Sequence, residues 1–356
     1  MHRNLARMTL CALVFAGTLP ALAAEGRIPI FGPGPIGADG KYVVTRDIFG
    51  TGAGPVIDIL APNVDIDLNG FTLTEPAGAF PVINVPGIFV TQLTVRNGSL
   101  NSGSFGIDAP VPGDKIVIED VKIGFPTTTG IHVLDIVSIA IRRVMIQGVG
   151  GGPGILIDGI APQTAVIEDS VIRDVGGDGI NFISGSITVL NNKIAGTGGL
   201  GPPGAAISLT AADSSLVSEN TIVGSGTEGI ALSGTRGGKL FDNLVQSSVS
   251  HGIHLDLGTS GILVLNNVAT GNGFALPGGH GLFVEGSLNQ LDRNTLNSNS
   301  GYGLFFTGGG NTFGRNMARA NGGPAGCPLL FPPNSCDVGA GNSTFGDNLI
   351  PGPPFF

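Results

Sequence analysis

Four reactive side chains each come directly before a glycine, and an aliphatic residue follows that glycine. They are Asp178, Glu228, His251 and His280, and Tyr302 takes the same position later in the chain. A neutral imidazole beside a carboxylate can act as a general base or acid near neutral pH. We therefore predict Glu228, His251 and His280 as catalytic residues and Asp178 as a substrate-binding residue.

Outward positions of the strand after each glycine extend this set. Asn181, His254, Asp256 and Glu285 occupy them and are predicted to bind substrate. An alternative stays open, because Asp, Glu and His before glycine are common turn formers, and an exposed ridge has to be polar in any case.

The glycine–aliphatic step belongs to an internal repeat of about 22 to 26 residues. It recurs at Gly106-Ile107, Gly130-Ile131, Gly154-Ile155, Gly179-Ile180, Gly229-Ile230, Gly252-Ile253, Gly281-Leu282 and Gly303-Leu304. Ala206-Ile207 fills the one gap, and Pro81-Val82 and Pro55-Val56 continue the series toward the N-terminus. About eleven units result, too short for propeller blades of about 40 residues.

Each unit consists of short alternating strands and a polar corner. Stacked in parallel, equivalent residues of successive units lie about 4.8 Å apart. One internal stack would then contain Ile107, Ile131, Ile155, Ile180, Ile207, Ile230 and Ile253. We expect the glycines to supply a sharp turn. We expect the corner asparagines to adopt a left-handed backbone and to hydrogen-bond along their own ladder; they are Asn220, Asn243, Asn267, Asn294 and Asn316.

The stack places the reactive side chains on one outer ridge. His251 and His280 belong to neighbouring coils and would lie about 5 Å apart if the insertion between them bulges outward. Insertions at 196–204 and 272–279 enter at the same edge. Loops on one surface of a solenoid commonly wall a binding groove. The sequence therefore predicts a shallow groove on the C-terminal half, lined by carboxylates and imidazoles.

The two ends of the chain differ from the repeat. Residues 1–24 resemble a signal peptide, with Arg3 and Arg7 before an apolar run that is shorter than the ~20 residues of a membrane span. We expect residues 25–54 to cap the first coil, 55–321 to form the solenoid, and 322–356 to form a terminal coil, a disulfide loop and a cap. Cys327 and Cys336 are a close pair, which in an exported chain indicates a disulfide rather than a metal site.

Charge and export limit the partners. Removal of residues 1–24 leaves 15 basic and 26 acidic residues, a net charge of −11. This disfavours nucleic acid, which requires clustered Lys and Arg, and weighs modestly against a strongly polyanionic substrate. We predict a secreted or periplasmic protein with no transmembrane segment after signal removal. The sequence leaves its oligomeric state open.

The repeat resembles the right-handed parallel β-helix proteins of the pectin lyase-like superfamily. The segments 40–48 and 63–73 resemble the first coils of its branch of NosD-like and carbohydrate-processing modules. The resemblance implies an all-β, right-handed parallel β-helix of about eleven coils with N- and C-terminal caps. It also implies binding of an extracellular polysaccharide, with cleavage or epimerisation as the enzymatic form of that function.

Family enzyme motifs are present only in part. Gly177-Asp178-Gly179 and Gly279-His280-Gly281 resemble fragments of polygalacturonase motifs, without the paired aspartates or the Arg-x-Lys clamp. Lyases and epimerases need a base and a positive charge; calcium stays open as a cofactor, and Arg236 and Lys239 are the nearest cations. No Trp and only 2 Tyr disfavour a sugar-stacking platform.

Two other hypotheses are a non-catalytic structural or interaction protein of the cell envelope and, by analogy with NosD, an accessory role in copper delivery.

Overall fold

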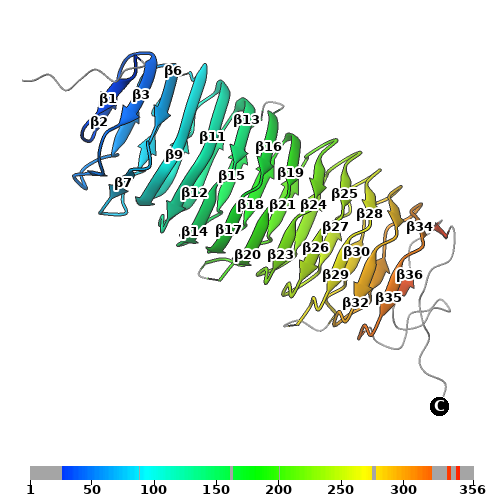
Figure 1. Ribbon diagram of the computed structural model, residues 1–356. Helices are drawn as coiled ribbons and strands as arrows, with labels where there is room; N and C mark the ends of the chain where they lie inside the picture. The colour runs from blue at the N-terminus through cyan, green and yellow to red at the C-terminus, as the bar shows by residue number, and fades with distance from the viewer. Residues whose placement is uncertain are drawn as a thin grey trace, which may run out of the picture.

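The chain winds into one long solenoid of parallel β-strands (Figure 1). This computed structural model describes residues 26–322, apart from 88, 161–162, 200 and 275–277, together with 335–337 and 342–344. The strands follow one another in chain order from β1 at the N-terminal end to β35 near the other. All regular elements in these ranges are strands, as the sequence predicts.

One sheet has 13 strands, one from each coil. They are β2 (Gly34–Ile36), β5 (Ile57–Ile59), β8 (Ile83–Asn84), β10 (Phe105–Ala109), β12 (Thr129–Leu134), β15 (Ile155–Asp158), β18 (Ile180–Ile183), β21 (Ile207–Thr210), β24 (Ile230–Ser233), β27 (Ile253–Leu255), β30 (Leu282–Val284), β33 (Leu304–Phe306) and β36 (Ser335–Asp337). The stack is therefore slightly longer than the expected eleven coils.

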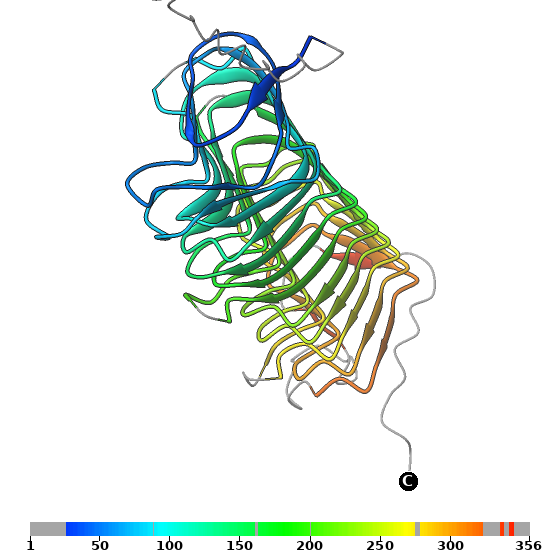
Figure 2. The same cartoon turned by 60° about the vertical axis from the view of Figure 1, so that its left-hand side comes forward.

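The second sheet has 24 strands and bends around a corner of the coil, so that most coils add two strands to it (Figure 2). They are β1 (Ile28–Ile30), β3 (Gly40–Val44), β4 (Ile48–Phe49), β6 (Asn63–Asp67), β7 (Thr72–Glu75), β9 (Gln92–Ser102), β11 (Gly113–Gly124), β13 (Ile136–Arg142), β14 (Met145–Val149), β16 (Gln163–Glu168), β17 (Val171–Val175), β19 (Gly185–Leu190), β20 (Lys193–Thr197), β22 (Leu216–Ser218), β23 (Thr221–Val223), β25 (Lys239–Phe241), β26 (Leu244–Gln246), β28 (Leu263–Leu265), β29 (Val268–Thr270), β31 (Gln290–Asp292), β32 (Thr295–Asn297), β34 (Thr312–Gly314), β35 (Met317–Arg319) and β37 (Ser343–Thr344).

The predicted isoleucine stack runs through the centre of the 13-stranded sheet. Ile107 pairs with Ile131, and the register continues coil by coil to Ile253 and then Leu282. The stacked isoleucines are all 0% exposed. Full burial of one such side chain stabilises the fold by roughly 1.5–3 kcal/mol, so this repeated column is a principal source of stability.

The register of the first coils corrects the sequence alignment by one residue. Ile107 pairs with Ile83, and Ile57 pairs with Ile83. The positions equivalent to Gly106 are therefore Val82 and Val56, and not the prolines before them that the sequence repeat predicts. The error arose because both residues of each Val-Ile step are buried and aliphatic, so hydrophobicity alone did not fix the register.

The corner asparagines form the expected ladder but not with the expected backbone. Asn267 donates from Nδ2 to Asn294 Oδ1 at 3.1 Å, and its Oδ1 accepts from Asn243 Nδ2 at 2.9 Å. The left-handed residue is the one before each asparagine, as at Asn266 with φ 56°. A buried amide that bonds along the ladder leaves the positive φ to its exposed neighbour. The prediction that the corner asparagines themselves are left-handed is wrong.

The glycines before the first strand serve close packing rather than a left-handed turn. None of them has a positive φ. A Cβ on Gly130 would lie 2.4 Å from the carbonyl oxygen of Gly154 in the next coil, and one on Gly252 would lie 2.6 Å from that of Gly281. Glycine is therefore required there because backbone approaches backbone.

The terminal segments contribute strands of their own. Residues 25–54, predicted as a cap, contain β1 to β4, which pair with strands of the next coil. β36 and β37 fall within 322–356 and pair with β33 and β34. Residues 1–24, Cys327 and the last residues lie outside the described residues, so the signal peptide, the disulfide and the capping role stay predictions.

Candidate functional site

The candidate site lies on the outer face of the 13-stranded sheet. Side chains alternate along a strand, so the second residue after each glycine points outward while the aliphatic residue before it is buried. The residue before the glycine precedes the strand, and its ring packs against the outward one, as His251 does against His254 with centroids 5.4 Å apart. In the coil of β27 these positions hold His251 and His254, and in the coil of β30 they hold His280 and Phe283. In the coil of β33 they hold Tyr302 and Phe305. Three neighbouring coils therefore present six rings on one face.

These rings pack into one group, which we call the ring cluster. His251 and His280 are stacked with centroids 5.1 Å apart, in agreement with the spacing expected from the repeat. His254 stacks on Phe283 at 4.9 Å, and Phe283 stacks on Phe305 at 5.3 Å. The ring cluster consists of His251, His254, His280, Phe283, Tyr302 and Phe305.

Two imidazoles of the cluster are tied to the backbone of the next coil. His251 Nδ1 accepts a hydrogen bond from the backbone amide of His280 at 3.0 Å, and His280 Nδ1 accepts one from the amide of Tyr302 at 2.9 Å. An Nδ1 that accepts must be unprotonated, so the proton of each neutral ring is on Nε2.

Burial reinforces this neutral state. Burial, together with the nearby His254, lowers the pKa of His251 to about 4, against the opposing effect of Glu228. Burial and the other two imidazoles lower the pKa of His280 to about 3. Neutral rings at pH 7 suit packing and hydrogen-bond donation from Nε2, whereas such low pKa values make both rings weak bases.

His254 has a carboxylate partner. Its Nε2 lies 2.9 Å from Glu285 Oε2, and the two side chains are 20% and 35% exposed. This is the imidazole–carboxylate contact of the cluster, and both groups are accessible from outside. Of the predicted substrate-binding residues, these two lie at the ring cluster with the side-chain geometry that proton transfer requires.

Asp178 and Asn181 form a separate pair toward the N-terminal side of the cluster. Asn181 Nδ2 donates to Asp178 Oδ2 at 2.7 Å, and the Ala205 amide donates to Oδ1 at 2.7 Å. Burial raises the pKa of Asp178, and the nearby Glu228 adds to the rise, against the two hydrogen bonds. Glu228 therefore lies between this pair and His251, close enough to influence both carboxyl and imidazole.

Asp256 has a structural role in its turn. Its Oδ1 accepts from the amides of Gly234 and Gly258 at 3.2 and 3.0 Å and from the Thr259 hydroxyl at 3.1 Å. Burial alone would raise the pKa of Asp256, but these hydrogen bonds outweigh it and lower the pKa. The carboxylate thus closes the turn after β27.

A second imidazole site lies on the same face, five strands from β27. His132 Nδ1 is 2.8 Å from Asp108 Oδ1, and His132 Nε2 is 3.3 Å from Asp158 Oδ1. Burial by itself would lower the pKa of His132, but the hydrogen bonds and charges of the two aspartates outweigh it and raise the pKa. The imidazole therefore links three coils through two carboxylates.

Sequence reasoning missed this triad and both phenylalanines of the ring cluster. The repeat does contain a signal for these residues. The second position after the repeat glycine holds Asp108, His132, Phe283 and Phe305 in four different coils. The expectation of no stacking platform rested on Trp and Tyr counts. It did not consider that Phe in an alternating strand can point outward.

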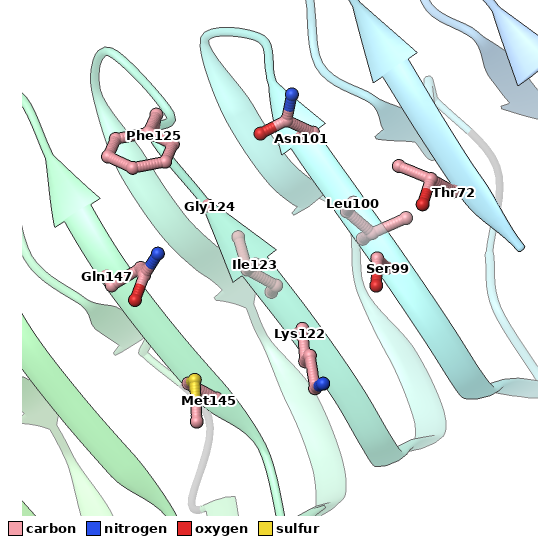
Figure 3. A pocket seen from close by; sticks show the side chains of 10 residues that line it. All are labelled: Thr72, Ser99, Leu100, Asn101, Lys122, Ile123, Gly124, Phe125, Met145 and Gln147. Atoms are coloured by element: carbon pink, nitrogen blue, oxygen red, sulfur yellow. The ribbon is translucent and has the colours of Figure 1, made fainter. Parts of the chain in front are cut away.

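A pocket of about 180 Å³ lies elsewhere, on the 24-stranded sheet (Figure 3). It is lined by Thr72, Ser99, Leu100, Asn101, Lys122, Ile123, Gly124, Phe125, Met145 and Gln147. Lys122 is the one titratable group in this lining, so the pocket lacks the paired groups of acid–base chemistry and is separate from the candidate site. Within the described residues, no group of three His, Cys, Asp or Glu is arranged to hold a metal ion.

The parallel stack and its repeat define a class, the right-handed β-helix proteins. The chain belongs to this family, whose model for the right-handed β-helix region matches residues 129–321. No curated protein sequence matches the chain. Across the described residues, no helix is long and apolar enough to cross a membrane.

Solved structures with this fold include enzymes that act on carbohydrates. A variant of the periplasmic alginate epimerase AlgG is 11% identical, with 85% of this chain and 77% of that chain covered and a TM-score of 0.50. The A-module of mannuronan C-5 epimerase AlgE6 from Azotobacter vinelandii is 15% identical, with coverage of 87% and 91% and a TM-score of 0.48. DFA-IIIase from Arthrobacter chlorophenolicus is 14% identical, with coverage of 90% and 87% and a TM-score of 0.46. At 11% identity, the likeness to AlgG concerns the fold alone.

Proposed function

We propose that this protein binds an extracellular polysaccharide on the outer face of the 13-stranded sheet, at the ring cluster. The observation that carries the proposal is the continuous stack of rings across β27, β30 and β33, bordered by Glu228 and Glu285. His280 and Tyr302 are buried within this stack, and its other four rings are half-buried. Aromatic faces bury the apolar face of a sugar ring, and carboxylates beside them accept hydrogen bonds from its hydroxyls. Three coils span about 10 Å along the solenoid axis, long enough for a disaccharide unit.

The fold supports a long ligand. The outer face continues without interruption past Asp178 and Asn181 to the His132 triad, because every coil adds one strand in the same register. A polymer lying along this face would contact successive coils in equivalent ways. The epimerase activity that names the structurally similar AlgG is compatible with such a ligand, and it enters here as an analogy of fold alone.

Cleavage or epimerisation would require a proton-transfer group at this face. Glu228, His251 and His280 remain the predicted catalytic residues. Among the imidazoles of the cluster, His254 is the better placed for proton transfer, since its Nε2 faces Glu285 and neither of its ring nitrogens accepts a backbone amide within the described residues. We propose His254 and Glu285 as the acid–base pair of such a reaction.

The proposed setting is secretion or the periplasm, in keeping with the signal-like residues 1–24 and the cysteine pair. The alternative, a non-catalytic interaction protein of the cell envelope, uses the same flat sheet faces for a protein partner.

A panel experiment separates these functions. The purified protein is incubated with neutral, acidic and amino polysaccharides, and thermal shift, reducing ends and unsaturated-product absorbance are followed. We expect a thermal shift with at least one polysaccharide, reduced by Ala substitution of Glu228, His251 or His280. A panel without any response, or three variants with unchanged binding and turnover, would refute a polysaccharide site at the ring cluster.

A further inference from the structure

Charged side chains are sorted between the two sheets. All 15 Lys and Arg residues after residue 24 lie in the 24-stranded sheet or in the corners and turns that adjoin its strands. None lies in a strand of the 13-stranded sheet. That sheet and the residues flanking its strands carry every histidine after residue 24, at 132, 251, 254 and 280, together with Asp58, Asp108, Asp158, Asp178, Glu228, Asp256 and Glu285.

Five arginines associated with the other sheet, Arg27, Arg96, Arg142, Arg143 and Arg315, pair with carboxylates there. Arg142 bonds Glu119 and Glu168 on the coils to either side, and Arg143 bonds Asp120 through two nitrogens. These ion pairs hold neighbouring coils together on the 24-stranded sheet. The carboxylates of the ring-cluster face have no comparable partners: Glu285 contacts the His254 imidazole, and Glu228 makes no ion pair within the described part of the chain.

The imidazoles of the ring cluster do not offset this negative charge. His251 and His280 use Nδ1 as an acceptor for backbone amides and are buried, so both are neutral near pH 7. Arg236 lies in the turn after β24, and its backbone amide is bonded to Asp213. Arg293 is nearer to the cluster along the chain, and it follows β31 of the 24-stranded sheet. A ligand at the cluster therefore meets aromatic faces and carboxylates.

We infer that the polysaccharide bound at the ring cluster carries protonated amino groups rather than carboxylates. The inference rests on the proposed function and specifies its ligand. An ammonium group is attracted both by the face of an aromatic ring and by Glu228 and Glu285. A uronate carboxylate at the same place would be repelled by both glutamates with no Lys or Arg to pair with it. The site thus selects an amino-sugar polymer and disfavours polyuronates.

Calorimetric titration with three oligosaccharides of matched length tests this selectivity. The probes are oligomers of glucosamine, of N-acetylglucosamine and of a uronic acid, used at a mildly acidic pH where the glucosamine amines are protonated. We expect the glucosamine oligomer to bind at least about tenfold more tightly than the acetylated one, and its affinity to fall as salt is raised. The uronate oligomer should not bind.

Charge-neutral variants identify the groups responsible. Glu285→Gln and Glu228→Gln should each weaken glucosamine binding by about tenfold and should weaken binding of the acetylated oligomer much less. Asp114→Asn, an exposed carboxylate in β11 of the other sheet, is the matched control and should bind as the wild type does.

The outcomes separate the two claims. Equal or tighter binding of the acetylated or uronate oligomer, abolished by loss of the ring-cluster side chains, would overturn the amino-sugar inference and leave the proposed polysaccharide site standing. Binding of none of the three would overturn the inference, and the wider polysaccharide panel then decides the proposed function. Glucosamine binding that the two glutamine variants do not weaken would also overturn it.

Discussion

The Nδ1 atom of His251 accepts a hydrogen bond from the backbone amide of His280, 3.0 Å away in the next coil, and the two rings stack with centroids 5.1 Å apart. The imidazole thereby takes the part that an asparagine side chain plays elsewhere in the solenoid. Asn267 Oδ1, for example, accepts from the backbone amide of Asn243 at 3.1 Å. Stacked coils leave backbone amides at their corners, and a buried acceptor in the neighbouring coil satisfies each one.

Because of this arrangement, the free energy of unfolding should fall as the pH is lowered. In the folded protein, burial holds the pKa of His251 to about 4 and that of His280 to about 3, both below the ordinary value of 6.5. The unfolded chain therefore binds more protons as the pH falls below about 6.5, and the stabilisation present at pH 7 is lost between there and the folded pKa values. For His251 the loss is on the order of 3 kcal/mol. Urea denaturation across this pH range should show it.

Asparagine substitution tests the same mechanism. His251→Asn places an amide oxygen near the position of Nδ1. The variant therefore keeps a side-chain acceptor for the backbone amide of His280 and removes the titrating group. We expect the variant to fold and to lose less stability than the wild type between pH 7 and 4. An unchanged pH slope would show that the carboxylates, rather than this imidazole, set the acid sensitivity.

His132 should respond to pH in the opposite direction. Its pKa is raised by Asp108 and Asp158, which outweigh the effect of burial, so the folded state binds the proton more tightly than the unfolded state does. This stabilisation is fully present below the unfolded pKa and is lost as the pH rises through the raised folded pKa. NMR titration should find the His132 imidazole pKa above its ordinary value. His132→Gln should remove the loss of stability on the alkaline side, and a normal or lowered His132 pKa would contradict the triad.

The sequence predicted the solenoid because its strongest signal, the glycine–aliphatic repeat, is also the physical cause of the stack. It predicted the proximity of His251 and His280 for the same reason. It did not predict which imidazole nitrogen accepts a hydrogen bond, since that depends on where a backbone amide of the next coil points. Phe283 and Phe305 do not enter an expectation that counts only Trp and Tyr as stacking residues, although the alternation of the strand turns both phenylalanines outward. The His132 triad joins residues from three coils, and Asp158 does not occupy the repeat position that Asp108 and His132 share, so the repeat alone does not bring the three together.

Two adjacent asparagines should differ sharply in their effect on stability. Asn267 is fully buried, and its Nδ2 donates to the carbonyls of Leu240 and Leu265 as well as to Asn294. Asn267→Ala should cost about 2–4 kcal/mol, because several buried partners lose their hydrogen bonds. Asn266 has φ 56°, so Asn266→Gly should be close to neutral, since glycine adopts this backbone freely. Chemical denaturation of both variants measures the difference; equal costs would refute the assignment of the ladder to the second asparagine.

The ring cluster itself is tested by truncation of its most central ring. Phe283 contacts His251, His254, His280 and Phe305 and is half-buried on the outer face of β30. Phe283→Ala should weaken polysaccharide binding by about tenfold or more, because an aromatic stacking contact contributes roughly 1 kcal/mol beyond the area it buries. Phe241→Ala is the matched control, since Phe241 is a half-buried phenylalanine in β25 of the other sheet. Affinity measured by calorimetry should fall only for Phe283→Ala; an equal fall in both variants would point to a general loss of stability, and no fall in either would place the ligand elsewhere on the solenoid.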